Sequence, residues 1–207
     1  MPINIGLVGG AGNLKNPSDP LALGYRVNWV KNPTFEVDTT GWVGTGGATI
    51  AQTTSDANTG TGALLFTNSS GSSVEVTNRI PMLSDGPFQV SMYIKLLPGA
   101  DTANYYIRCL QYQTEFSSST VAASNLGIQN LSVTGDWVRL SGQFTKASIG
   151  NYAIIRLVTE SAQLGDQVLL DSVMFEDAAT LGTYFDGDVD GFWSGTPNNS
   201  YSGGSPY

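Results

Sequence analysis

Alternation of apolar and polar residues dominates this chain. The clearest run is Phe88–Leu96, in which every second residue is apolar and the intervening residues are mostly polar. Similar runs, ended by glycine, proline, asparagine or serine, occupy 48–53, 62–67, 73–80, 104–112, 127–133, 137–144, 151–159 and 168–175. No convincing helix of three turns is present. Short strands at this spacing predict an all-β protein, a two-sheet jelly-roll sandwich.

The same pattern divides the chain into three parts. Residues 1–27 sustain neither a strand nor a helix period and predict an extended N-terminal arm. Residues 28–177 form the predicted jelly roll, which opens with a first strand and a polar turn closed by Trp42. Residues 178–207 predict an irregular, aromatic and glycine-rich C-terminal extension. Its large aromatic residues need burial against a partner subunit or the back of the sandwich: Tyr184, Phe185, Phe192 and Trp193.

Charge and composition exclude several functions. The net charge of −8 disfavours nucleic acid and anionic membranes as partners. The start of the chain lacks the features of a signal peptide, and no stretch has the length of a membrane span, so we expect synthesis in the cytoplasm and no membrane insertion. The chain has no histidine, which removes histidine-dependent triads and metal sites. Most hydrolase and metalloenzyme functions are excluded with them. The single Cys109 has Ile107 and Tyr105 as neighbours at strand spacing, which predicts a buried thiol.

Three short motifs resemble carbohydrate-binding modules of the galactose-binding-like jelly-roll class. Asn32-Pro-Thr-Phe-Glu36, followed by Gly41-Trp42, resembles the opening of those modules. Leu169-Leu-Asp-Ser-Val173 resembles their last strand, with Ser172 in place of a second aspartate, and Gly135-Asp-Trp-Val138 resembles their tryptophan strand. The resemblance spans about residues 28 to 177 and implies a non-catalytic module that binds glycans.

The C-terminal part carries a second resemblance. Tyr184-Phe-Asp-Gly-Asp188, followed by Trp193-Ser-Gly-Thr196, is similar to the end of minor tail proteins of tailed bacteriophages. This implies a structural protein of the virion that forms a homo-oligomer and also contacts other tail proteins. Its jelly roll would contact host cell-wall polysaccharide. One alternative is a decoration or scaffold subunit that binds only other virion proteins. Another is a sugar-binding module cut from a glycosidase.

Two acidic features are candidates for calcium. The resemblance to carbohydrate-binding modules implies that Glu36 and Asp171 hold one structural calcium ion between the first and last strands. The alternative is a pair of solvated or hydrogen-bonded carboxylates at strand ends. The stretch Asp186–Gly191 matches the first half of an EF-hand loop, but Pro197 occupies the position of the final glutamate. We therefore favour an acidic turn there.

Aromatic residues supply the candidate ligand site. Tyr106, Arg108 and Tyr112 alternate onto one face of their strand, and Tyr93 lies on the strand that we expect to be its neighbour. Sugars bind to flat aromatic faces flanked by polar groups, so these four residues form the predicted glycan site. The alternative is that one face belongs to the core and the other contacts the second sheet or a partner. Trp42 and Trp137 are expected in the core.

Overall fold

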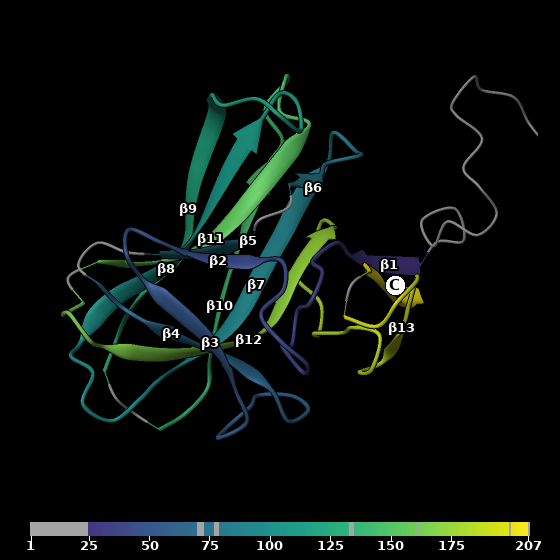
Figure 1. Ribbon diagram of the computed structural model, residues 1–207. Helices are drawn as coiled ribbons and strands as arrows, with labels where there is room; N and C mark the ends of the chain where they lie inside the picture. Colours follow the sequence, from purple (N-terminus) through teal and green to yellow (C-terminus); the bar gives the residue numbers. More distant parts are fainter. Residues whose placement is uncertain are drawn as a thin grey trace, which may run out of the picture.

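The computed structural model describes residues 25–69, 73–76, 79–132, 135–160, 162–198 and 200–206, and for 73–76 and 206 it describes the backbone alone. In these residues the regular structure consists of strands arranged in two sheets (Figure 1). No helix in this part of the chain has the length and apolar character to cross a membrane. Most of the predicted N-terminal arm, residues 1–24, lies outside the described residues.

The larger sheet, sheet A, has eight strands in antiparallel pairs. They are β1 (Tyr25–Asn28), β3 (Thr49–Thr53), β4 (Ala63–Thr67), β7 (Pro87–Leu96), β10 (Val138–Thr145), β12 (Gln167–Asp177), β13 (Gly191–Trp193) and β14 (Ser202–Pro206). The strand order is β10-β7-β12-β1-β14-β13, and β4 pairs with the first half of β12 and with β3.

The smaller sheet, sheet B, has six strands, also in antiparallel pairs. They are β2 (Trp42–Thr45), β5 (Ser73–Val76), β6 (Ile80–Pro81), β8 (Ala103–Tyr112), β9 (Thr120–Leu131) and β11 (Tyr152–Glu160). The order is β2-β5-β11-β8-β9, and β6 pairs with β11. The predicted all-β, two-sheet jelly-roll sandwich is confirmed.

The core lies between the two sheets and follows the predicted alternation. On β7, the apolar residues from Phe88 to Leu96 face inward, and Tyr105, Ile107 and Cys109 of β8 face them from sheet B. Rings of Phe88, Phe144 and Phe175 are within 5.5 to 5.8 Å of one another between centroids. Cys109 is fully buried, as predicted, and burial raises the pKa of its thiol well above the ordinary value.

A bulge at Ser172 divides β12 into two halves. Ser172 has a positive φ of 51°, and the register with β7 shifts between Asp171 and Met174. The shift keeps Val168 and Leu170 before it, and Val173 and Phe175 after it, on the core side. The bulge also marks the point where β12 changes its partner from β4 to β1.

Several predicted boundaries were wrong. The first strand is Tyr25–Asn28, which begins inside the range assigned to the arm, and residues 29 to 41 form bends and turns. The run 73–80 is not one strand, because β5 ends at Val76 and β6 begins at Ile80. The extension is not wholly irregular, since β14 pairs with β1 and β13 pairs with β14. These short strands lack a long alternating pattern, and pairing distant in sequence stabilises them.

The C-terminal extension packs on the outer face of sheet A. Tyr184 and Phe185 are buried against Met174 of β12, which confirms the back of the sandwich as their place. Figure 1 shows the yellow C-terminal segment beside β1. Phe192 is 40% exposed, although its ring contacts Tyr25 edge-on at 5.5 Å.

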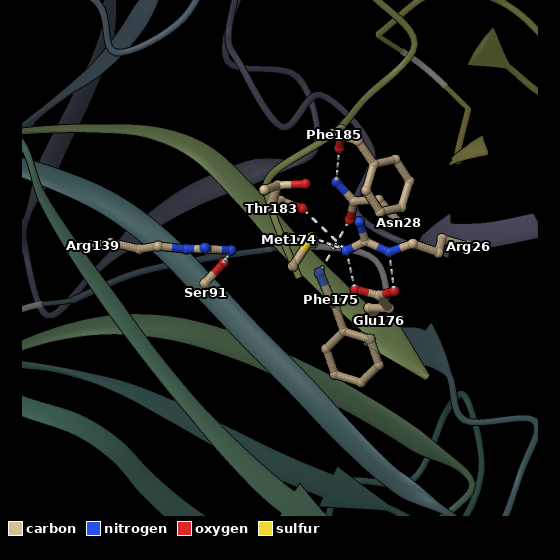
Figure 2. Close-up of polar contacts among 9 residues, drawn as sticks. All are labelled: Arg26, Asn28, Ser91, Arg139, Met174, Phe175, Glu176, Thr183 and Phe185. Atoms are coloured by element: carbon tan, nitrogen blue, oxygen red, sulfur yellow. Dashed lines mark hydrogen bonds and ion pairs between the residues drawn. The ribbon is translucent and has the colours of Figure 1, made fainter. Parts of the chain in front are cut away.

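Two residues of β1 fix the extension (Figure 2). The Arg26 guanidinium donates to both carboxylate oxygens of Glu176, at 2.6 and 2.7 Å, and to the Thr183 carbonyl at 3.1 Å. It also lies 4.4 Å from the centre of the Phe185 ring. The buried Asn28 amide donates to the carbonyls of Val173 and Phe185, which joins the extension to β12.

Candidate functional site

The outer face of sheet B carries polar side chains from two central strands. Residues of β8 and β11 that alternate with the core residues point outward, and register places Asn104 opposite Glu160 and Arg108 opposite Arg156. We call this surface the polar face, and it consists of Asn104, Tyr106, Arg108, Arg156 and Glu160. On its β9 side, the Asn130 amide donates to the Asn104 side-chain oxygen at 2.9 Å.

Tyr106 lies at the centre of the polar face. It is only 4% exposed, and its phenol interacts with the carboxylate of Glu160 and the guanidinium of Arg108. Burial raises the pKa of Tyr106, and the neighbouring negative charge of Glu160 raises it further. The phenol is therefore neutral at physiological pH and has a hydroxyl hydrogen to donate.

Arg108 lies beside Tyr106 with hydrogen-bonding capacity to spare. The residue is half-buried, and its Nε is buried with no hydrogen-bond acceptor among the described residues. A buried donor without an acceptor is costly, and a ligand oxygen or a bridging water would satisfy it. A guanidinium, a carboxylate and amides on one surface match the alternating donors and acceptors of a polyol.

Tyr112 faces the same way as Tyr106 but is covered. It is 6% exposed, and the Arg79 guanidinium lies 3.7 Å from its ring centre. Arg79 in turn donates to the carbonyls of Thr114, at 2.6 Å, and Ser117. The three residues thus share one face of β8, but the rings of Tyr106 and Tyr112 are both buried, and their role in glycan binding stays a prediction.

Tyr93 does not belong with the other three residues. Its strand, β7, lies in sheet A, whereas β8 lies in sheet B, so the two strands are not neighbours. The Tyr93 side chain points to the outer face of sheet A and packs against the cluster of Met174, Tyr184 and Phe185. The expectation was wrong because consecutive strands of a jelly roll often cross from one sheet to the other.

The two carboxylates of the predicted calcium pair lie at one turn, residues 58–62. Asp171 accepts hydrogen bonds from the backbone N–H groups of Asn58 (2.7 Å) and Thr59 (2.9 Å). Glu36 accepts from the N–H groups of Thr61 (3.1 Å) and Gly62 (3.2 Å). Burial raises the pKa of Asp171 to about 7, because the backbone N–H donors offset the loss of solvent only in part, and the nearby negative charge of Glu36 raises the pKa further.

The EF-hand-like stretch forms an acidic turn, the interpretation that the sequence favoured. Asp186 is buried and accepts from the N–H groups of Asp188 and Val189, both at 2.7 Å, and from the Tyr184 hydroxyl at 2.8 Å. Burial raises the pKa of Asp186. Side chains of Glu36, Asp186 and Asp188 line one cavity of about 210 Å³.

The described residues supply an incomplete set of calcium ligands. No group of three or more histidine, cysteine, aspartate or glutamate side chains is arranged to hold a metal in that part of the chain. Glu36 and Asp171 offer two carboxylates, so backbone carbonyls would have to complete the shell of six to eight oxygens. The calcium site stays a prediction.

Other expectations were only partly correct, and one residue was missed. Trp42 is buried in the core and donates to the Asn32 carbonyl at 3.1 Å. Trp137 is only half-buried and donates to Asp56 at 3.3 Å. Sequence reasoning did not identify Glu160, which lies one residue beyond the alternating run 151–159 and is the last residue of β11.

Comparison with known proteins gives a family match over most of the sandwich. The profile of the carbohydrate binding domain family CBM_4_9 matches residues 27–164. Endo-1,4-beta-xylanase A of Thermoanaerobacterium saccharolyticum is 27% identical over 148 residues, which are 69% of this chain and 12% of the xylanase. The chain thus spans a small part of the length of this curated relative.

Solved structures share the fold. The CBM22-1 xylan-binding domain of Xyn10C from Paenibacillus barcinonensis matches with a TM-score of 0.58 and 20% identity, over 71% of this chain and 93% of that domain. The enzymatically active domain of tailspike protein 4 from bacteriophage CBA120 matches with a TM-score of 0.53 and 16% identity, over 72% of this chain and 21% of that chain. At these identities the likeness shows the fold alone.

Proposed function

We propose that this chain, which belongs to the carbohydrate binding domain family CBM_4_9, binds a polysaccharide through the polar face of sheet B. The observation that carries the proposal is the cluster of Tyr106, Arg108 and Glu160, in which a neutral phenol lies between a guanidinium and a carboxylate. The cluster lies on the outer face of sheet B, whereas Tyr184 and Phe185 of the C-terminal extension pack on the outer face of sheet A.

The chemistry of this face favours hydrogen bonding over aromatic stacking. The rings of Tyr106 and Tyr112 are buried, so a sugar would contact the edge of Tyr106 and the planar guanidinium of Arg108. Arg108 donates to ligand hydroxyl oxygens, and Glu160 accepts hydroxyl hydrogens. Because the similar Paenibacillus domain is a xylan-binding domain, a β-1,4-linked pentose polymer is the first candidate.

Binding to polysaccharide gives a direct test. Retention of the protein on insoluble xylan and on bacterial cell-wall polysaccharide is measured for the native chain, Tyr106→Phe, Arg108→Ala and Glu160→Gln. We expect Arg108→Ala and Glu160→Gln to weaken retention about tenfold or more, because each removes about 1.5–3 kcal/mol of hydrogen bonding that involves a charged group. Tyr106→Phe should weaken retention about twofold to tenfold, because a hydrogen bond from a neutral phenol contributes about 0.5–1.5 kcal/mol.

The matched control is Tyr93→Phe, which removes the same hydroxyl from the outer face of sheet A. Retention that survives in all three polar-face variants would place binding elsewhere. Retention lost equally in the control would indicate a general loss of folding.

The biological setting that we propose is the tail of a bacteriophage virion, in which the chain is a non-catalytic minor tail protein that contacts host glycans. The support is the resemblance of Tyr184–Asp188 and Trp193–Thr196 to the end of such proteins. Many copies on one particle would make weak sugar binding effective through multivalency. Mass spectrometry of purified virions tests this setting, and absence of the chain from particles would contradict it.

The second candidate is a virion subunit that binds only other virion proteins. The exposed Phe192 on β13 favours it, because an aromatic side chain that is 40% exposed beside a paired hairpin suits a protein contact. Assembly into particles without any retention on polysaccharide would support this candidate over the first.

A further inference from the structure

A cavity of about 370 Å³ lies where the C-terminal extension meets the rim of sheet B. Trp29, Lys31, Arg79, Glu115 and Tyr201 contribute to its walls. Ligand sites in proteins begin at about 300 Å³, so this volume suits a small ligand. Four of these wall residues lie within the family match at 27–164, whereas Tyr201 lies outside it.

Two aromatic rings form one wall of the cavity. The ring centres of Trp29 and Tyr201 are 5.0 Å apart, with an angle of 45° between the ring planes. Backbone hydrogen bonds hold both residues in place. The Trp29 N–H donates to the Phe175 carbonyl at 3.0 Å. The Tyr201 carbonyl accepts from the N–H (3.0 Å) and the hydroxyl (2.7 Å) of Ser194. The rings are half-buried and therefore remain partly accessible.

The polar groups of the cavity are largely uncommitted. Within the described residues, the indole N–H of Trp29, the hydroxyl of Tyr201, the amine of Lys31 and the carboxylate of Glu115 make no side-chain hydrogen bond or ion pair. Arg79 is different, because it is fixed by two carbonyls and by the ring of Tyr112. The cavity therefore offers donors and an acceptor around an aromatic wall.

We propose that this cavity is a second saccharide site, separate from the polar face, that takes one ring of a neutral sugar. The apolar face of a pyranose packs on an aromatic ring, while its hydroxyl groups require both donors and acceptors. Lys31 and Trp29 supply donors, and Glu115 supplies an acceptor, so the cavity can satisfy both kinds of hydroxyl contact. The site is completed by Tyr201, so the C-terminal extension is part of the binding apparatus as well as an attachment.

Indole resonances provide the test. The chain has four tryptophans, and each gives one indole N–H signal in a ¹⁵N–¹H correlation spectrum. The Trp29 signal is assigned with Trp29→Phe, and methyl β-xyloside, methyl β-glucoside and methyl β-galactoside are titrated into the full chain. We expect at least one of these glycosides to shift the Trp29 signal saturably and to leave the buried Trp42 signal in place.

Variants separate this site from the polar face. Tyr201→Ala should weaken the titration roughly tenfold, because it removes one aromatic wall. Phe192→Ala is the matched control, since it removes an exposed aromatic ring from the same extension, and Arg108→Ala tests the polar face. Both should leave the Trp29 titration unchanged.

Three results would overturn the proposal. They are no shift of the Trp29 signal with any neutral glycoside, a shift with glucuronate alone, and a titration that Tyr201→Ala does not alter. The proposal takes its ligand class from the proposed function but not its site. Polysaccharide retention that survives in Arg108→Ala, together with a Trp29 titration that Tyr201→Ala weakens, contradicts the polar-face proposal alone. Retention lost in Arg108→Ala, together with no Trp29 titration in the native chain, contradicts the second site alone.

Discussion

Glu176→Gln is expected to destabilise the protein strongly. The Glu176 side chain is 0% exposed and that of Arg26 is 10% exposed, and the two are joined by a bidentate contact of 2.6 and 2.7 Å (Figure 2). The substitution leaves a buried guanidinium without its counter-charge. Removing one partner of a buried pair costs about 3–5 kcal/mol.

The expected cost converts to a large change in melting temperature. For a chain of this size, 1 kcal/mol corresponds to about 2–4 °C, so the predicted decrease in Tm is roughly 6–20 °C. Differential scanning calorimetry measures it. Limited proteolysis adds a local readout, because weakening the contacts of Arg26 with Thr183 and Phe185 should expose the extension to cleavage.

A double-mutant cycle separates the charge interaction between Arg26 and Glu176 from the packing of their side chains. Arg26→Met combined with Glu176→Gln removes both charges, and replacing a buried ion pair by uncharged groups is often close to neutral. We therefore expect the double variant to be more stable than Glu176→Gln alone. A single variant within about 1 kcal/mol of the native protein, or a double variant with additive losses, would refute the reasoning.

Three further predictions concern buried groups. Asp171 has a folded-state pKa of about 7, above the ordinary 3.8, so its contribution to stability is fully present below about pH 4 and is lost as the pH rises through 7. Urea unfolding in EDTA should thus show up to about 3 kcal/mol more stability at pH 5 than at pH 8 from this group, and an equal pH response in Asp171→Asn would contradict it. Calcium added at pH 8 should raise Tm if Glu36 and Asp171 bind it, and Glu36→Gln should abolish the rise; an unmoved Tm in the native chain removes the metal prediction. Cys109 should react with a thiol reagent only on unfolding, and rapid modification of the folded protein would contradict its burial.

Alternation made the sandwich predictable, because strands with one buried face have a period of two. The run Phe88–Leu96 shows this directly, since each of its alternate apolar residues lies in the core. The same alternation placed Tyr106 and Arg108 on one face. It said nothing of which sheet each strand joins, and for that reason Tyr93 was assigned to the wrong neighbour.

Contacts distant in sequence account for the other differences. The strand Tyr25–Asn28 is too short to be recognised, and it exists because β14 and the second half of β12 pair with it. The residues of β12 are buried on both faces, so its bulge at Ser172 leaves no mark in the polarity pattern. The covering of Tyr112 depends on Arg79, which lies more than thirty residues away in the chain.

The most direct test of polysaccharide binding on sheet B is to map a bound oligosaccharide by NMR. Xylohexaose is titrated into ¹⁵N-labelled protein with assigned backbone amides, and the shifts are placed on the strands. The account predicts that xylohexaose shifts the amide signals of β8 and β11 around Tyr106, Arg108 and Glu160. In Arg108→Ala, xylohexaose should leave the signals of these two strands unshifted. Saturable shifts confined to sheet A, or an absence of binding by xylohexaose and by host cell-wall fragments alike, would contradict it.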